Sequence, residues 1–136
     1  MDLWESYKTS VFLCHQPLGD QIDFAIISAQ NPAGHLYHPQ HNLTLDREFE
    51  TELDEAHIPY RTIIGASPDL SFQEKSWAVL CDKTKALSLA LKFRQNAIYW
   101  VEAGQLYLVP ALMFKTGQAA EEYLGPYLAR QIVLQG

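Results

Sequence analysis

The chain has 136 residues, about half of them apolar, and a formal net charge of −6, which suits one domain with a real hydrophobic core. The negative charge argues against nucleic acid as a partner, and no apolar run approaches the roughly 18 residues of a membrane span. We therefore expect a single domain over residues 1–136 with no nucleic-acid or membrane partner. No secretory signal is visible in MDLWESYKTS, and cysteines that are expected to be free thiols predict a cytoplasmic location.

The first third of the chain predicts two strands. Residues 10–15 (SVFLCH) form a short strand, and residues 23–29 (DFAIISA) form a second one. The continuous apolar run of the second strand is typical of a central strand that is covered on both faces. A loop over residues 30–41 follows, and Cys14 and Cys81 are expected to be buried free thiols.

The first helix is expected over Asn42–Ala56. Leu45, Phe49, Leu53 and Ala56 recur at steps of four, four and three, which places them on one face of a helix. The side-chain oxygen of Asn42 can accept a free backbone N–H of the first turn, so Asn42 is the expected N-cap.

The middle of the chain predicts two strands and a second helix. Residues 60–66 (YRTIIGA) and 76–82 (SWAVLCD) are the strands. Asp82 then caps a helix over residues 83–96, whose alanine and leucine residues give it a broad apolar face.

The last third predicts a hairpin and a third helix. Residues 97–112 form the hairpin, with its turn at Glu102–Gln105. Residues 116–134 form a helix that is kinked near Pro126, because proline removes a backbone donor and clashes with the preceding turn. The element order ββαββαββα predicts an α+β domain with a mixed or mostly antiparallel sheet of about six strands and helices packed on it.

Several of these segments together resemble an uncharacterised bacterial family, domain-of-unknown-function family 3293. The segments are ISAQNPAG, the helix opened by Asn42, GASPDLSFQEKSWAV and ALSLALKFRQNAI, and they cover residues 22–110 approximately. The resemblance implies a fold and the place of a site, but no reaction. It assigns the family's polar positions to Asn31, Asn42, Asp69, Glu74, Ser76 and Gln95.

The chain departs from the family's pattern at three positions. The resemblance implies Gly where Leu70 and Arg94 stand, and Trp where Phe72 stands. If the family's Gly at the Arg94 position adopts a positive φ, the arginine there is strained, because a side chain disfavours that backbone conformation.

A polar set stands at or beside the ends of predicted strands: Asn31, Glu74, Ser76 and Gln95. Side chains that arrive from separate strand ends can converge at one edge of a sheet. Convergent amides and one carboxylate orient a small ligand, or activate a water if Glu74 is desolvated, so Glu74 is the catalytic candidate and Asn31, Asn42, Ser76 and Gln95 are ligand-binding candidates. The alternative is that each residue only satisfies loop backbone groups, as Asn-Pro turns and helix ends commonly require.

His35, His38 and His41 recur at every third position of the loop GHLYHPQHN. Imidazole is a common metal ligand, but this spacing matches no standard zinc motif. We expect no metal site and no cofactor.

The charges are unevenly distributed, since acidic residues crowd the first helix and basic residues lie on the second. The first interpretation is a protein-binding or accessory module, with a protein partner or a second copy of the chain as its partner, that acts through Glu48, Glu52 and Glu55 or through the aromatic hairpin. The alternative is a small-molecule-binding protein or hydrolase-like enzyme that uses the strand-end residues. Whether the protein is an enzyme stays open, because neither a nucleophile elbow nor a phosphate-binding loop is present.

Overall fold

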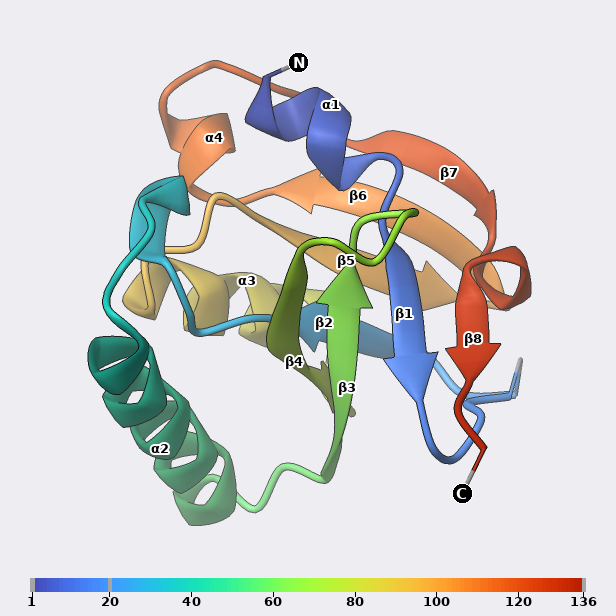
Figure 1. The fold of residues 1–136 in the computed structure, drawn as a ribbon, viewed down its shortest axis with the longest axis horizontal. Coiled ribbons are helices and arrows are strands. Elements are labelled where there is room, and N and C mark those ends of the chain that lie inside the picture. The colour runs from blue at the N-terminus through green and yellow to red at the C-terminus, as the bar shows by residue number, and fades with distance from the viewer. Residues whose placement is uncertain (1, 20, 136) are drawn as a thin grey trace.

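The centre of the molecule is a curled sheet of eight strands (Figure 1). The computed structural model describes residues 2–19 and 21–135. Across the sheet the strands follow the order β7 (Glu122–Pro126), β6 (Gln105–Pro110), β5 (Ala97–Glu102), β2 (Phe24–Ile27), β4 (Gln73–Val79), β3 (Tyr60–Ala66), β1 (Val11–Cys14) and β8 (Gln131–Val133). Neighbouring strands pair antiparallel, except that β1 and β8 pair parallel.

The helices connect and cover these strands. They are α1 (Leu3–Tyr7), α2 (Pro39–Glu55), α3 (Lys83–Lys92) and α4 (Leu112–Lys115), with short 3-10 turns η1 (Pro32–Gly34) and η2 (Tyr127–Ala129). Within the described part of the chain, no helix is both long and apolar enough to cross a bilayer.

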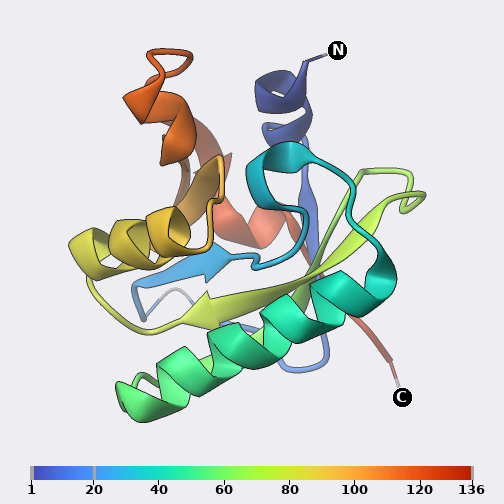
Figure 2. The same cartoon turned by 90° about the vertical axis from the view of Figure 1, so that its left-hand side faces the viewer.

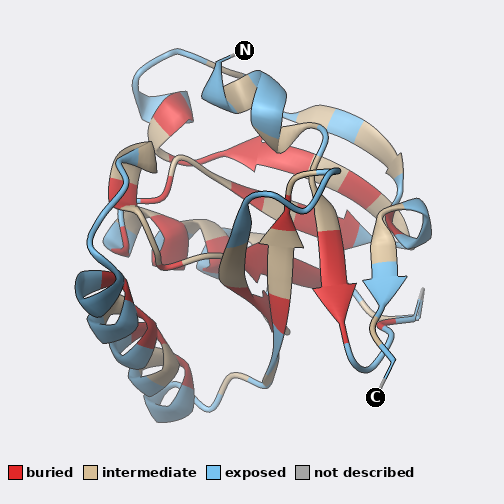
Figure 3. Ribbon diagram, in the orientation of Figure 1, coloured by how far each residue is buried: buried red, intermediate tan, exposed pale blue. Residues whose placement is uncertain are grey.

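One face of the sheet, here called the helix-covered face, packs against α2 and α3 (Figure 2). Phe49 and Leu53 of α2 and Leu89 of α3 are buried against Ile27 and Trp77 of the sheet. The buried side of α2 turns toward the strands and its exposed side turns to solvent (Figure 3). This cluster is one of two that form the core.

The opposite face, here called the inner face, holds the second cluster. At one end of it Phe24 meets Tyr127 edge to face, with ring centroids 5.3 Å apart. Val101 and Leu106, which are fully buried, pack in the same cluster. We call the part of the inner face around Phe24, Val101, Leu106 and Tyr127 the filled end. Toward the other end of the same strands the side chains become polar and the face is hollow.

Several expectations are confirmed. The fold is α+β with a mixed sheet. Asp82 caps α3 by accepting a hydrogen bond from the backbone N–H of Lys85 at 2.7 Å. The hairpin of β5 and β6 turns at Ala103 and Gly104, which have φ of +51° and +75°. Positive φ at both central residues is typical of a type I′ hairpin turn.

The predicted number of strands and the predicted C-terminal helix are wrong. The sheet has eight strands rather than about six, and residues 116–134 contain β7, η2 and β8 instead of a kinked helix. Gly125 has a φ of +95°, which is incompatible with a helix interior. The edges of β6 and β1 supply hydrogen-bond partners for β7 and β8, so tertiary pairing overrides the local helical pattern of this segment.

The predicted start of the first helix is also wrong. α2 begins at Pro39, and the side chain of His38 is its N-cap, because its Nδ1 accepts from the backbone N–H of Gln40 at 3.0 Å. Proline is tolerated at the first position of a helix, where its missing N–H has no partner to lose. Asn42 lies one turn inside the helix instead of capping it. The helix ends at Glu55 with Ala56 as its C-cap, close to the expected end, but Ala56 is exposed and does not belong to the buried stripe.

Candidate functional site

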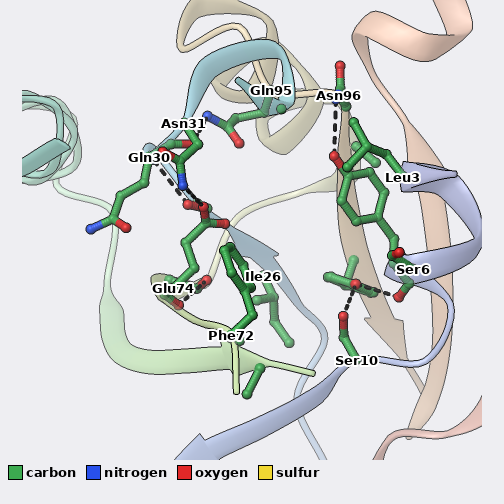
Figure 4. Close-up of a pocket in the computed structure, with 18 of the residues that line it drawn as sticks. Leu3, Ser6, Ser10, Ile26, Gln30, Asn31, Phe72, Glu74, Gln95 and Asn96 are labelled. Carbon is green, nitrogen blue, oxygen red and sulfur yellow. Dashed lines mark hydrogen bonds between the residues drawn. The ribbon is translucent and has the colours of Figure 1, made fainter. Parts of the chain in front are cut away.

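The four strand-end candidates line one pocket on the inner face. The pocket has a volume of about 480 Å³, and Asn31, Glu74, Ser76 and Gln95 all contribute to its walls. In Figure 4, Asn31, Glu74 and Gln95 lie on one side of the open space, and Leu3, Ser6 and Asn96 lie on the other. Of the two alternatives that the sequence left open, the structure therefore shows the first: the four polar residues lie around one pocket.

The side-chain amide of Asn31 is held in one orientation. Its Oδ1 accepts from the backbone N–H of Tyr37 and from Nδ2 of Asn42, both at 2.9 Å. A backbone N–H can only donate, so the oxygen must face Tyr37 and the Nδ2 must face the other way. There the Nδ2 donates to Oε1 of Glu74 at 2.8 Å.

The backbone of Asn31 is also fixed. Its φ of +48° and ψ of +58° lie in the left-handed region, which Asn tolerates better than most residues. The backbone N–H donates to Oδ1 of Asn42 at 2.9 Å. Asn42 thus lies behind the wall rather than in it, and its two hydrogen bonds to Asn31 join α2 to the turn after β2.

Glu74 is the one formally charged side chain among the described residues that line the pocket. It lies on β4, where it pairs in register with Gly65 of β3. Burial raises the pKa of the Glu74 carboxyl, hydrogen bonds from Asn31 and Ser28 oppose the rise, and the charge of Asp46 adds to it. No described residue forms an ion pair with Glu74.

Gln95 is placed by the end of α3. Arg94 has a φ of +56°, the N–H of Gln95 donates to the carbonyl of Ala90 at 2.8 Å, and that of Arg94 donates to Leu91 at 3.1 Å. This is a Schellman motif, in which glycine is the usual residue at the Arg94 position. The Nε2 of Gln95 then donates to the backbone oxygens of Gln30 at 3.1 Å and Phe93 at 3.2 Å, so it ties α3 to the turn after β2.

Ser76 forms part of the pocket floor. Its Oγ donates to the backbone oxygen of its neighbour Glu74 at 3.2 Å, and the side chain is almost fully buried. On the adjacent strand stands Gly65, where an added Cβ would lie 3.4 Å from that Oγ. A larger side chain at residue 65 would therefore extend into the pocket.

The opposite wall comes from α1 and β5. The hydroxyl of Tyr7 accepts from Nδ2 of Asn96 at 3.0 Å, and that of Tyr99 lies within hydrogen-bond distance of Oγ of Ser10 at 2.8 Å. Burial raises the pKa of both tyrosines, so both are neutral at ordinary pH. Gly34 lets the chain approach α1, because a Cβ there would lie 2.6 Å from Leu3.

Apolar side chains surround the entrance. Leu3, Leu36 and Phe72 line the pocket and are exposed, Leu36 at 83% and Phe72 at 49%. Phe72 stands where the resemblance implies Trp, so an aromatic ring is kept at the entrance. Ile26 and Leu108 form apolar walls further in.

The remaining polar position of the family, Asp69, lies outside the pocket lining. Asp69 holds the exposed turn between β3 and β4: it accepts from the backbone N–H of Ser71 at 3.0 Å, from the Ser71 hydroxyl at 2.8 Å and from the Ser67 hydroxyl at 2.8 Å. These hydrogen bonds lower the pKa of Asp69 to about 2. In the same turn Leu70 has a φ of +63°. Both non-glycine departures, Leu70 and Arg94, therefore adopt the backbone conformation that favours glycine.

The loop histidines do not converge. His35, His38 and His41 are exposed, His38 caps α2, and the ring of His41 stacks on Tyr37 with centroids 4.8 Å apart. Among the residues that the structure describes, no cluster of three metal-ligating side chains exists.

Fewer acidic side chains are free on the surface of α2 than its sequence suggests. Glu48 and Glu55 are exposed on α2, but Glu52 forms an ion pair with Lys92 at 2.7 Å. Asp46 is 4% exposed, and its Oδ2 accepts from Nε2 of Gln30 at 2.8 Å. Its Oδ1 is buried without a hydrogen-bond partner.

Sequence reasoning missed two important side chains, Tyr7 and Asp46. The buried positions of α2 are Asn42, Asp46, Phe49 and Leu53, at steps of four, three and four. Extending the apolar stripe of α2 toward the N-terminus at these steps would have predicted that Asp46 and Asn42 are buried. For Tyr7 the sequence offered only Asp2, which caps α1 by accepting from the N–H of Glu5 at 2.9 Å and so indicates a helix but not its place over the pocket.

This arrangement can orient a ligand and exchange a proton with it. Gln95 donates both N–H groups of its amide within the wall, and Asn31 uses its amide oxygen and one N–H there, so both side chains position the site. Glu74 is the group with free acceptor capacity and a raised pKa. A desolvated carboxyl of this kind binds a donor strongly and is suited to general acid–base chemistry.

No curated protein and no solved structure matches the chain. A family model matches residues 27–98, more than half of the chain and somewhat less than the segment expected from the sequence. The match contains Asn31, Asn42, Glu74 and Gln95, whereas Tyr7 lies outside it. The chain belongs to the family described as "Protein of unknown function (DUF3293)".

Proposed function

We propose that the protein binds a small organic molecule in the inner-face pocket, and that Glu74 is the polar group that contacts this molecule. The observation that carries the proposal is the meeting of Asn31, Glu74 and Gln95, from three separate segments, around one cavity of about 480 Å³. Pockets of a few hundred Å³ with mostly apolar walls and a few convergent polar groups are typical ligand sites.

The cost of building this wall supports the proposal. A carboxyl is desolvated without a cation beside it, and Asn31 and Ala33 adopt φ of +48° and +57°. Such arrangements oppose stability and are concentrated at functional sites. Close packing of apolar side chains would have been the more stable way to fill this end of the sheet.

Two observations rank a protein-binding role second. Trp100 of the predicted aromatic surface is only 6% exposed, so it belongs to the core. Glu52 of the acidic surface is engaged by Lys92. The pocket, in contrast, has no described side chain that fills it.

The proposal can be tested by blocking the pocket. Gly65→Leu places a side chain in the cavity, while Thr62→Leu adds the same side chain at an exposed position of the same strand, on the opposite face. A fragment library is screened by ¹H–¹⁵N correlation NMR. We expect fragments that shift the amide resonances of pocket residues in the wild type and in Thr62→Leu, but not in Gly65→Leu.

Two results would contradict the proposal. One is that no fragment shifts resonances of the pocket lining in the wild-type protein. The other is that such shifts persist unchanged in Gly65→Leu, which would place binding elsewhere.

A further inference from the structure

The charges around the pocket restrict its ligand. Glu74 is the single formally charged lining residue, and no lysine, arginine or histidine is among the described residues of the wall. Asp46, which is almost fully buried, adds negative potential at Glu74. An anionic ligand would enter an acidic, partly desolvated site with no cation to receive it, which is strongly unfavourable.

The Glu74 carboxylate also lacks a charged hydrogen-bond donor among the described residues. Asn31 and Ser28 donate to the carboxyl, but both are neutral donors. A carboxylate that is removed from water without a cation nearby is destabilised, and a charged donor would remove much of that penalty. The structure supplies no such donor from its described residues, so the ligand is the natural source.

The rest of the cavity suits an apolar body. Ile26 and Leu108 line the interior, and Leu36 and Phe72 surround the entrance. On the far wall the Tyr7 oxygen accepts from Asn96, which leaves the phenolic hydrogen free to donate to a ligand acceptor. A molecule that spans the pocket would therefore place a donor at Glu74 and apolar atoms between the walls.

Building on the proposed function, we propose that the ligand of this pocket is an organic cation: a protonated amine or related nitrogen base carried on an apolar or aromatic body, with its N–H groups on the Glu74 carboxylate. This choice satisfies the unpaired carboxylate, the absence of cationic lining residues and the apolar walls together. Neutral molecules of the same shape satisfy the walls alone.

Three probes with the same aromatic body test this inference: 2-phenylethylamine, 2-phenylethanol and phenylacetate. Each is titrated by NMR into the wild type, Glu74→Gln and Glu55→Gln, at about pH 8, where an exposed carboxyl is ionised and the amine is still charged. Glu55 is an exposed carboxylate at the end of α2, so Glu55→Gln is the matched change of net charge outside the pocket.

We expect the amine to bind about tenfold more tightly than the alcohol, as a charge-assisted hydrogen bond allows, and phenylacetate not to bind. The preference for the amine should disappear in Glu74→Gln and persist in Glu55→Gln. Equal binding of amine and alcohol in the wild type, or a preference that survives in Glu74→Gln, would overturn the inference and leave the pocket as a site for neutral molecules. If none of the probes shifts pocket resonances and the fragment screen is also empty, the proposed function fails as well.

Discussion

The two ends of the inner face are built from the same strands but differ in chemistry. Along β2 the inward side chains run from Phe24 at the filled end through Ile26 to Ser28 at the pocket. Along β4 they run from Ala78 to Ser76 and Glu74. Both strands therefore change from apolar to polar in the same direction, so the hollow depends on two central strands of the sheet and not on one loop alone.

The backbone at the pocket end also contains residues with positive φ. Around the pocket end, Asn31, Ala33 and Arg94 adopt positive φ, and the N–H of Ala33 donates to the carbonyl of Arg94 at 2.7 Å. The turn after β2 and the end of α3 are thus locked together in conformations that cost free energy. The filled end contributes stability by close packing, while the pocket end uses part of that stability to position polar groups.

The sharpest comparison of the two ends uses two leucines of β6. Leu106 and Leu108 are both fully buried and face inward, but Leu106 packs in the filled end and Leu108 lines the pocket. Leu106→Ala should cost about 3–5 kcal/mol of unfolding free energy, since it leaves a closed cavity. Leu108→Ala only enlarges an existing hollow, so it should cost roughly 1–2 kcal/mol less.

Urea denaturation of both variants measures this difference. Equal losses of stability would mean that the pocket end is as tightly packed as the filled end, and the comparison between them would fail.

The second prediction concerns Asn31. Asn31→Ala removes the acceptor of Tyr37 N–H and Asn42 Nδ2 and the donor to Glu74, and it places alanine at a φ of +48°. We expect a loss of about 2–3 kcal/mol from the unsatisfied partners and the strained backbone. Thermal or urea unfolding gives the value.

Asn31→Gly is the matched control, because glycine removes the same amide but accepts the positive φ. It should be about 1 kcal/mol more stable than Asn31→Ala. If both variants unfold like the wild type, the amide network has no structural role.

The sequence predicted best the elements with strong local patterns. β2, α3 and the hairpin of β5 and β6 carry their own periodicity, caps and turn residues, so local physics determines them. The polar residues Asn31, Glu74 and Gln95 could be named as candidates because each lies at or beside the end of a predicted strand. Whether they converge stayed open, since local sequence does not fix which strand ends are neighbours.

The remaining features depend on tertiary partners. β8 has three residues and is a strand because the edge of β1 accepts it. β7 is a strand beside β6 for the same reason, although a helix was expected over this segment. The role of Tyr7 depends on the docking of α1 over the pocket, which no pattern within α1 predicts.

The third prediction concerns the two positions where the resemblance implies glycine. Leu70 and Arg94 are exposed and have φ of +63° and +56°. Leu70→Gly and Arg94→Gly should each raise the free energy of unfolding by about 0.5–1 kcal/mol, because relief of backbone strain exceeds the added entropy of the unfolded chain.

Two further glycine variants serve as controls for this prediction. His57 ends α2 with a φ of +55° in an equivalent Schellman motif, so His57→Gly should stabilise similarly away from the pocket. Ser88→Gly, at an exposed position inside α3, should instead destabilise by about 0.5 kcal/mol. A loss of stability in Arg94→Gly would indicate that the arginine side chain contributes more than its backbone conformation costs.

The smallest expected effect is that of Glu74→Gln, because glutamine keeps an acceptor for Asn31 and nearly the same shape. Burial raises the pKa of Glu74 in the folded protein, and Asp46 on α2 adds to the rise. As pH increases from about 4, the unfolded chain releases its proton first, so the folded state binds more protons and loses stability relative to the unfolded state. Glu74→Gln lacks this proton, and its stability relative to the wild type should therefore increase with pH and level off above the folded-state pKa. Urea unfolding at several pH values measures the difference, with Glu55→Gln as the control that removes a carboxylate at an exposed position. A difference between Glu74→Gln and the wild type that decreases as pH rises would mean that the folded protein stabilises the Glu74 carboxylate, and the pocket end would then contain no unmet charge for a cation to satisfy.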